Sequence, residues 1–146
     1  MSPEVAILAE KAAAVGRHLN RVADCLPASA AEMRPMTDAS DAVILHLWQA
    51  VQIVIDMAVS TCVRLGHGSP ASYGEAFRKL AAAGVVDSAL ADRLTRAAGF
   101  RNVVAHAYEA IDMTRVFHAA TQGPADLRSF LAAVAKLAET ATENKS

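Results

Sequence analysis

Residues 43–65, VILHLWQAVQIVIDMAVSTCVRL, decide the fold of this chain because they form its longest apolar stretch. Wound as a helix, the stretch places apolar side chains on nearly every side of the axis. This pattern is typical of a helix that is buried all round. The sequence predicts one helix that begins at Asp38 or Ser40 and ends at Gly66. We expect this helix to lie at the centre of the fold.

A helix this apolar invites comparison with a membrane span, and the sequence argues against that alternative. A span needs about 18 or more consecutive apolar residues. Polar side chains, including those of His46, Gln49, Gln52 and Asp56, interrupt this stretch. The chain begins Ser2-Pro3-Glu4 after its Met, without the basic and then apolar run of a secretory signal. We therefore expect a cytoplasmic protein, in which Cys25 and Cys62 stay reduced and pack as small apolar side chains.

Start and stop signals mark the other helices. Ser and Asp cap helix starts by accepting hydrogen bonds from free backbone N–H groups, and Gly or Pro commonly ends a helix. These signals predict helices from Ser2 to Pro27, from Ser72 (with Glu75 in a capping box) to Gly84, from Asp87 to Gly99, from Asp112 to a kink or break at Gly123-Pro124, and over 127–137. Residues 140–146 form a polar tail that we expect to fray. No segment shows the alternation of a strand. The sequence predicts one all-α domain over residues 1–146, an antiparallel helical bundle.

The overall charge is close to neutral. The 14 Lys and Arg residues nearly balance the 15 Asp and Glu residues, which leaves a formal net charge of -1. Many nucleic-acid-binding proteins carry a broad basic surface, and this chain does not have the composition for one. Any contact with RNA must therefore be local, or must arise when two copies of the chain associate.

Polar chemistry is concentrated in residues 99–108, GFRNVVAHAY. Arg101 offers a planar set of donors that suits a phosphate. His106 can take or give a proton near neutral pH. Asn102 lies four residues before His106 and therefore shares its helix face. Tyr108 adds a hydroxyl two residues further on.

The spacing of Arg101 and His106 poses a geometric problem. Five residues correspond to about 140° around a regular helix, so one helix does not aim both side chains at one atom. Either Gly99 keeps Arg101 at a loosened helix start, or a second copy of the chain completes the site. We favour a two-fold homodimer that brings two copies of this run together.

These residue types fit metal-independent cleavage of RNA. In that reaction the ribose 2′-hydroxyl attacks the neighbouring phosphate, His transfers protons, and Arg stabilises the charge that develops on the phosphate oxygens. One His does not conveniently serve as both base and acid, and a symmetric dimer supplies two. The sequence contains no glycine-rich phosphate loop, zinc spacing or nucleophile elbow, so we expect no metal and no cofactor.

The residues taken alone also allow structural interpretations without a catalytic role. The spacing alone slightly favours a solvated helix face for Arg101 and His106. Arg93 and Arg96, near the expected end at Gly99, suit the negative end of the helix dipole, and they could also extend a positive surface beside Arg101. Asp56 fits a solvated polar stripe, the interpretation we favour. Its functional alternative is a supporting role in which it orients Arg101 or His106.

Arg101-Asn102 followed by His106-Ala107-Tyr108 resembles the RX4HXY motif of HepT-like toxins in the HEPN superfamily. The similarity extends from about Ala50 to Phe130. It includes the following stretches: Ser72-Tyr73-Gly74-Glu75-Ala76-Phe77, Leu80-Ala81-Ala82-Ala83-Gly84-Val85, Ala98-Gly99-Phe100-Arg101-Asn102, and Asp112 before Val116-Phe117. Residue 117 is Phe where relatives commonly have Tyr.

The resemblance implies a helical homodimer that acts as the ribonuclease toxin of a bacterial type VII toxin–antitoxin system. Arg101 and His106 would be the catalytic pair, with Asn102 as a supporting polar residue. The partner would be an MNT-like nucleotidyltransferase antitoxin that can attach AMP to Tyr108. The added phosphate and base beside the Arg would then repel and block RNA. The alternative is a non-catalytic HEPN dimer that serves as a binding or regulatory scaffold for the nucleotidyltransferase. A third possibility is that Arg101 and His106 only hold the dimer together.

Overall fold

The computed structural model describes residues 2–145, with side chains over residues 2–141. Within this range the chain forms five α-helices and two short 3-10 turns. The helices are α1 (Pro3–Cys25), α2 (Asp38–Arg64), α3 (Tyr73–Ala82), α4 (Ser88–Ala107) and α5 (Met113–Lys145), and the turns are Ala30–Glu32 and Tyr108–Ala110. No strand occurs in the described residues, so the predicted all-α bundle is confirmed.

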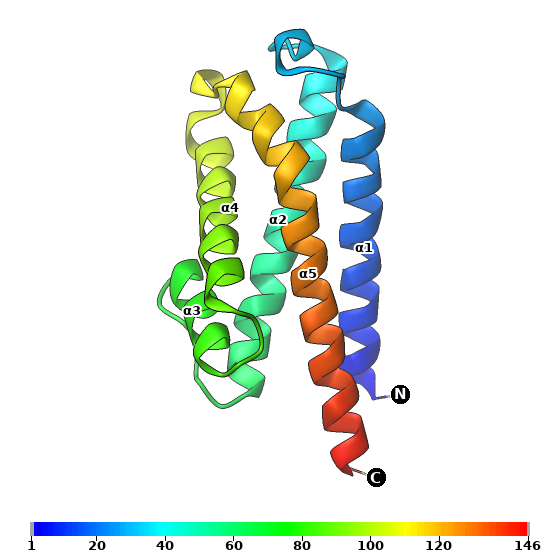
Figure 1. Ribbon diagram of the computed structural model, residues 1–146, viewed down its shortest axis with the longest axis vertical. Coiled ribbons are helices and arrows are strands. Elements are labelled where there is room, and N and C mark those ends of the chain that lie inside the picture. The colour runs from blue at the N-terminus through cyan, green and yellow to red at the C-terminus, as the bar shows by residue number, and fades with distance from the viewer. Residues whose placement is uncertain (1, 146) are drawn as a thin grey trace.

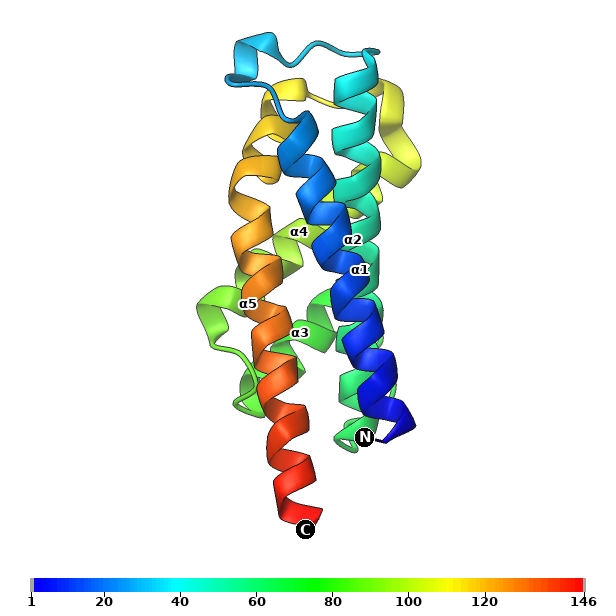
Figure 2. The ribbon, with the colours of Figure 1, turned by 90° about the vertical axis from the view of Figure 1, so that its right-hand side faces the viewer.

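Helix α2 is the central element of the bundle. It packs against each of the other four helices, and the ribbon shows α1 on one side of it, α4 on the other and α5 across it (Figures 1 and 2). By length and composition alone α2 is apolar enough to cross a membrane, but half of its most apolar 18-residue window is buried inside the bundle. The burial of apolar side chains against four neighbours accounts for this composition, as the predicted central helix requires.

The core fills the space between α2 and the surrounding helices. Phe77 of α3 and Phe130 of α5 are its largest fully buried side chains. Their rings meet edge to face with centroids 6.0 Å apart, which is a favourable aromatic geometry. Leu19 on α1 and Leu47 on α2 are buried in the same apolar cluster. The core therefore joins all the layers of the bundle and gives α4 a rigid support.

Most helix starts follow the predicted signals. In each case the side-chain oxygen of the capping residue accepts a hydrogen bond from a backbone N–H two or three residues later: Ser2 from Val5, Ser72 from Glu75, Asp87 from Leu90 and Asp112 from Thr114. Helix α2 begins at Asp38, one of the two predicted starts, and the side chain of Thr37 before it accepts a hydrogen bond from the backbone N–H of Ser40. Caps are local interactions, which is why the sequence predicts them well.

The predicted helix end at Gly99 is wrong, and so is a break at Gly123-Pro124, where a kink or a break was expected. Helix α4 runs through Gly99, and α5 runs through Gly123-Pro124. Packing on both sides of each position outweighs the weak local preference of Gly and the hydrogen bond that Pro loses. Ala98 is buried just before Gly99, and the buried residues Ala120 and Leu127 flank Pro124.

The backbone of residues 140–145 continues α5, and Ser146 lies outside the described residues. The expected fraying of the polar tail stays a prediction. The predicted ends near Gly66 and Gly84 are confirmed to within two residues. Both glycines follow the last turn of a helix with positive φ values of 82° and 78°, which side chains with a Cβ rarely adopt.

Candidate active site

The predicted site residues lie at the end of the bundle opposite the two chain ends, where α4 ends and α5 begins (Figure 1). Arg101 and His106 belong to the last two turns of α4, and Tyr108 starts the 3-10 turn that follows. Buried Leu94 and Ala98 fix α4 against the core. The sequence thus places its polar run at the exposed end of a well-anchored helix.

Arg101 is held by contacts from three sides. Its Nε donates a hydrogen bond to Oε1 of Gln52 on α2 over 2.6 Å, and its Nη1 donates to Oδ1 of Asn102 over 3.1 Å. The guanidinium carbon lies 5.8 Å from the ring centroid of Tyr73 on α3, within range of a cation–π interaction. Since the side chain is half-buried, these contacts fix the direction of its charge.

Gln52 connects Arg101 to Asp56. The Nε2 of Gln52 donates to Oδ1 of Asp56 over 3.0 Å, one helical turn along α2. Asp56 itself is exposed and makes no ion pair with Arg101 in the described structure. The carboxylate fixes the amide orientation of Gln52, so that the amide oxygen faces Arg101. Asp56 is therefore linked to the site through one intermediate side chain.

His106 lies on a different side of α4 from Arg101. It is exposed and has no hydrogen-bond partner among the residues that the structure describes. Because α4 is continuous from Ser88 to Ala107, the two side chains leave the helix about 140° apart. The loosened helix start at Gly99 is therefore wrong. Completion of the site by a second copy stays a prediction.

Tyr108 is fixed by an acidic residue far away in the sequence. Its hydroxyl donates a hydrogen bond to Oδ1 of Asp41, in the first turn of α2, over 2.8 Å. This hydrogen bond raises the pKa of the Tyr108 phenol, and partial burial and the charge of Asp41 raise it further. The phenol is thus neutral at physiological pH, with a carboxylate next to its proton.

Exposed apolar side chains lie beside this site. Leu45 of α2 is 49% exposed, Val103 of α4 is 48% exposed and Tyr108 is 42% exposed. An open hollow of about 440 Å³ lies between the two helices and is lined by Leu45, Trp48, Val104 and Tyr108. An apolar surface beside polar side chains is typical of a protein interface.

Sequence reasoning missed three contacts of the site. In the sequence Gln52 stands out only as a polar interruption of the apolar stretch, Tyr73 only within a stretch similar to HepT-like toxins, and Asp41 not at all. Gln52 is 49 residues from Arg101, and Asp41 is 67 residues from Tyr108. The available signal was the Gln52–Asp56 spacing of four, which places two polar side chains on one face of an apolar helix.

Comparison with solved structures defines the class of protein. The tri-AMPylated HEPN toxin of Shewanella oneidensis, solved in complex with MNT antitoxin, matches with a TM-score of 0.80 at 24% identity, over 92% of this chain and 98% of that chain. A chain of a mutant toxin–antitoxin complex, MntA–HpeT, matches with a TM-score of 0.77 at 25% identity, over 88% of this chain and 96% of that chain. The fold is that of a HEPN helical bundle.

Sequence comparison narrows this class to a family. The model of the ribonuclease HepT-like family matches residues 15–134, and the chain belongs to this family. The mRNA nuclease HepT of Shewanella oneidensis is 29% identical over 91 residues, which cover 62% of this chain and 68% of that protein. The family resemblance predicted from the RX4HXY motif is confirmed.

Proposed function

We propose that this chain is the toxin of a bacterial toxin–antitoxin pair and that it acts in the cytoplasm as a metal-independent endoribonuclease. The observation that carries the proposal is the fixed Arg101 guanidinium near the end of α4, bound to Gln52 and Asn102 and five residues before exposed His106 on the same helix. Membership of the HepT-like family and the likeness to an mRNA nuclease support the same activity.

The reaction follows from the residue chemistry. The 2′-hydroxyl of a ribose attacks the adjacent phosphorus, the new O–P bond forms, and the bond to the 5′-oxygen of the next nucleotide breaks. His106 accepts the proton of the 2′-hydroxyl, and a second His106 donates a proton to the leaving 5′-oxygen. Arg101 binds the phosphate oxygens as their negative charge increases. Asn102 supports Arg101 by accepting its Nη1 hydrogen bond.

A homodimer supplies the second His106. We place the partner copy over the apolar surface formed by Leu45 and Val103, because these exposed side chains lie beside or within the RX4HXY run. Burial of this surface would stabilise the dimer by removing apolar area from water. It would also bring the two ends of α4 together and build one cleft with two Arg101 and two His106 side chains.

Regulation is proposed to act through Tyr108. An MNT-like nucleotidyltransferase would transfer AMP from ATP, as the AMPylated toxin of the related complex suggests. The phenolic oxygen of Tyr108 attacks the α-phosphorus, pyrophosphate leaves, and Asp41 is positioned to accept the phenolic proton. The attached phosphate would oppose RNA binding at the cleft by charge repulsion. Co-expression with the nucleotidyltransferase should add AMP mass to the peptide that contains Tyr108, and Tyr108→Phe should abolish this addition.

The proposed activity is tested by expressing wild-type and His106→Ala chains in bacteria while growth and total RNA are followed. Wild type should arrest growth and fragment RNA, and His106→Ala should do neither. His67→Ala is the matched control, because His67 is an exposed loop residue. Equal and harmless behaviour of all three chains, with partner binding retained, would instead support the non-catalytic scaffold. Dissociation of an Arg101→Ala/His106→Ala variant in sedimentation would indicate that these residues only hold the dimer.

A further inference from the structure

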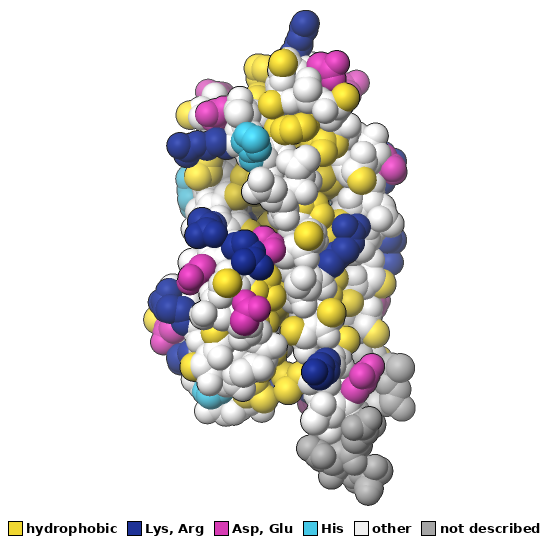
Figure 3. Space-filling model, in the orientation of Figure 1, with side chains coloured by type: hydrophobic (Ala, Val, Ile, Leu, Met, Phe, Trp, Pro, Cys, Tyr) yellow, Lys and Arg dark blue, Asp and Glu magenta, His cyan; other side chains and the backbone are white. Residues whose placement is uncertain are grey.

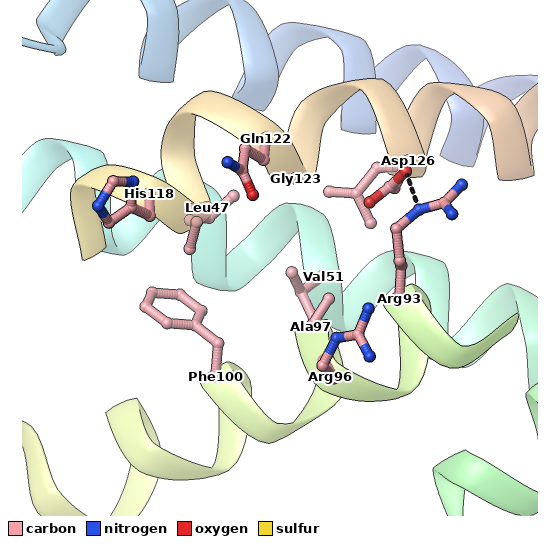
Figure 4. Close-up of a pocket in the computed structure, with 12 residues that line it drawn as sticks. Leu47, Val51, Arg93, Arg96, Ala97, Phe100, His118, Gln122, Gly123 and Asp126 are labelled. Carbon is pink, nitrogen blue, oxygen red and sulfur yellow. Dashed lines mark hydrogen bonds and ion pairs between the residues drawn. The ribbon is translucent and has the colours of Figure 1, made fainter. Parts of the chain in front are cut away.

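A pocket lies between α4 and α5, on a different side of α4 from the contact between Arg101 and Gln52. We call it the α4–α5 pocket, and its cavity volume is about 210 Å³. Apolar side chains of α2, including Leu47 and Val51, form its floor, and the Phe100 ring stands at one end (Figure 4). Arg96 extends from α4 into the opening, and Gln122 faces it from α5.

The polar rim of this pocket is positively charged. At one end Nε of Arg93 binds Oδ1 of Asp126 over 2.9 Å, which neutralises the acidic group of the rim. Arg96 is exposed and has no ion pair or hydrogen bond with any residue in the described part of the chain. On the same face of the molecule, Lys and Arg side chains gather over the α4 side (Figure 3). Arg96 is thus a cation available to a ligand.

The helix dipole does not explain Arg96. The sequence offered that explanation because α4 was expected to end at Gly99. The helix continues to Ala107, so Arg96 lies in its middle, and the dipole acts only within about the last turn. The position of Arg96 beside the apolar α4–α5 pocket therefore needs another explanation.

We propose that the α4–α5 pocket binds one unstacked base of the single-stranded RNA substrate, with Arg96 on the adjoining phosphate. This inference rests on the proposed ribonuclease function. The cavity is smaller than the roughly 300–1,000 Å³ of typical small-molecule sites, so it suits one ring system of a longer ligand. Phe100 offers an aromatic surface for that ring, while Gln122 and His118 offer hydrogen-bonding groups to its edge.

The pocket lies within reach of RNA in the catalytic cleft. Arg96 and His106 are ten residues apart on one continuous helix, which corresponds to about 15 Å along the axis and about 80° around it. A strand extending a few nucleotides from the cleaved bond spans this distance. Arg101 is assigned to the phosphate at the cleaved bond, so Arg96 adds a contact with a separate phosphate along the strand. Such a contact is needed in a chain whose net charge is -1.

The test measures binding of a short, labelled single-stranded RNA to the full chain carrying His106→Ala, which prevents cleavage. Fluorescence anisotropy is recorded over a range of salt concentrations for this parent chain and for three variants that carry one further substitution each: Arg96→Ala, Phe100→Leu or Arg17→Ala. Arg17 is the matched control because it is an exposed arginine on α1, which does not line the pocket. Thermal unfolding of each variant checks that the fold is retained.

Arg96→Ala should weaken binding about tenfold, and the slope of log affinity against log salt should become shallower by about 0.7. Phe100→Leu should weaken binding without changing the slope, because it removes a stacking surface and no charge. Arg17→Ala should leave the affinity within about twofold of its parent, since it contacts no phosphate.

Equal effects of Arg96→Ala and Arg17→Ala, or no effect of Arg96→Ala, would overturn the inference. AMP is titrated in parallel as a free nucleotide. Arg96-dependent binding of AMP together with Arg96-independent binding of RNA would show a mononucleotide site and would also overturn it. Failure of the His106→Ala chain to bind RNA would also overturn the inference. Cleavage by the wild-type chain is measured separately, so a failed pocket is distinguished from a failed ribonuclease proposal.

Discussion

The Nε of Arg101 donates a 2.6 Å hydrogen bond to Oε1 of Gln52, which joins the RX4HXY run on α4 to the central helix. Gln52 is oriented in turn by Asp56. The proposed phosphate-binding Arg therefore takes its direction from a residue outside the motif, on the most deeply packed helix of the bundle.

Gln52→Leu should lower kcat/KM for RNA cleavage about tenfold, because Arg101 loses the contact that orients it. Cleavage of a labelled RNA measures the effect. Gln49→Leu is the matched control, since Gln49 lies nearly one turn earlier on α2 and has no hydrogen bond to a described side chain. In an Arg101→Ala background Gln52→Leu should have no further effect. An equal loss in both backgrounds would contradict a role through Arg101.

Asp41→Asn should lower the pKa of the Tyr108 phenol towards its ordinary value. The carboxylate disfavours the phenolate by accepting the phenolic hydrogen bond and by its negative charge, and Asn removes that charge. In an alkaline titration, the phenolate absorbance that the wild type shows and Tyr108→Phe lacks reports the ionisation of Tyr108. An unchanged pKa in Asp41→Asn would show that the contact with Asp41 does not persist in solution.

A pair of histidines between α1 and α2 predicts pH-dependent stability. The Nδ1 atoms of His18 and His46 lie 3.0 Å apart, so at least one ring is neutral. Partial burial, His46 and Arg17 lower the pKa of His18 from 6.5. The His18 side chain is half-buried. Since the pKa of His18 is lower in the folded chain than in the unfolded chain, the unfolded chain binds more protons near this pH. The contribution of His18 to stability is therefore complete at pH values above 6.5 and decreases as the pH falls below 6.5.

Urea unfolding measures this effect between about pH 7.5 and about pH 5.5. The free energy of unfolding should fall over this interval in the wild type and fall less in His18→Asn. His67→Asn, which changes an exposed loop histidine, should behave like the wild type. The same decrease in His18→Asn as in the wild type would assign the pH dependence to other groups.

Gly99→Ala should increase the free energy of unfolding by about 1 kcal/mol, because Ala has the higher helix propensity. Gly99 is exposed within α4, and a Cβ there meets no atom within 4 Å. Urea unfolding gives the change in free energy. A decrease would mean that the chain needs a flexible joint at Gly99, as the sequence had suggested for Arg101.

The sequence predicts the parts of this structure that depend on neighbouring residues. The cap at Asp87, the capping signal at Ser72 and the apolar run of α2 each act within a few turns, and all three were confirmed. The helix breaks predicted at Gly99 and Pro124 do not occur, because tertiary packing outweighs the local preference of these residues against a helix, which amounts to a few kcal/mol.

The candidate site was predictable only in part for the same reason. The RX4HXY run is contiguous, so Arg101, His106 and Tyr108 were found from the sequence. Their contacts with Gln52 and Asp41 depend on how α4 packs against α2. No pattern within one helix specifies how α4 is aligned against α2. Local patterns also do not show whether a second copy of the chain takes part.

The central claim is that two His106 side chains from two copies act in one cleft. Wild-type and His106→Ala chains are co-expressed in varying ratios, purified together and assayed for RNA cleavage at constant total protein. If both copies are needed, the rate should fall with the square of the fraction of wild-type chains. A rate that falls linearly with this fraction, or a wild-type protein that cleaves no RNA, would contradict the account.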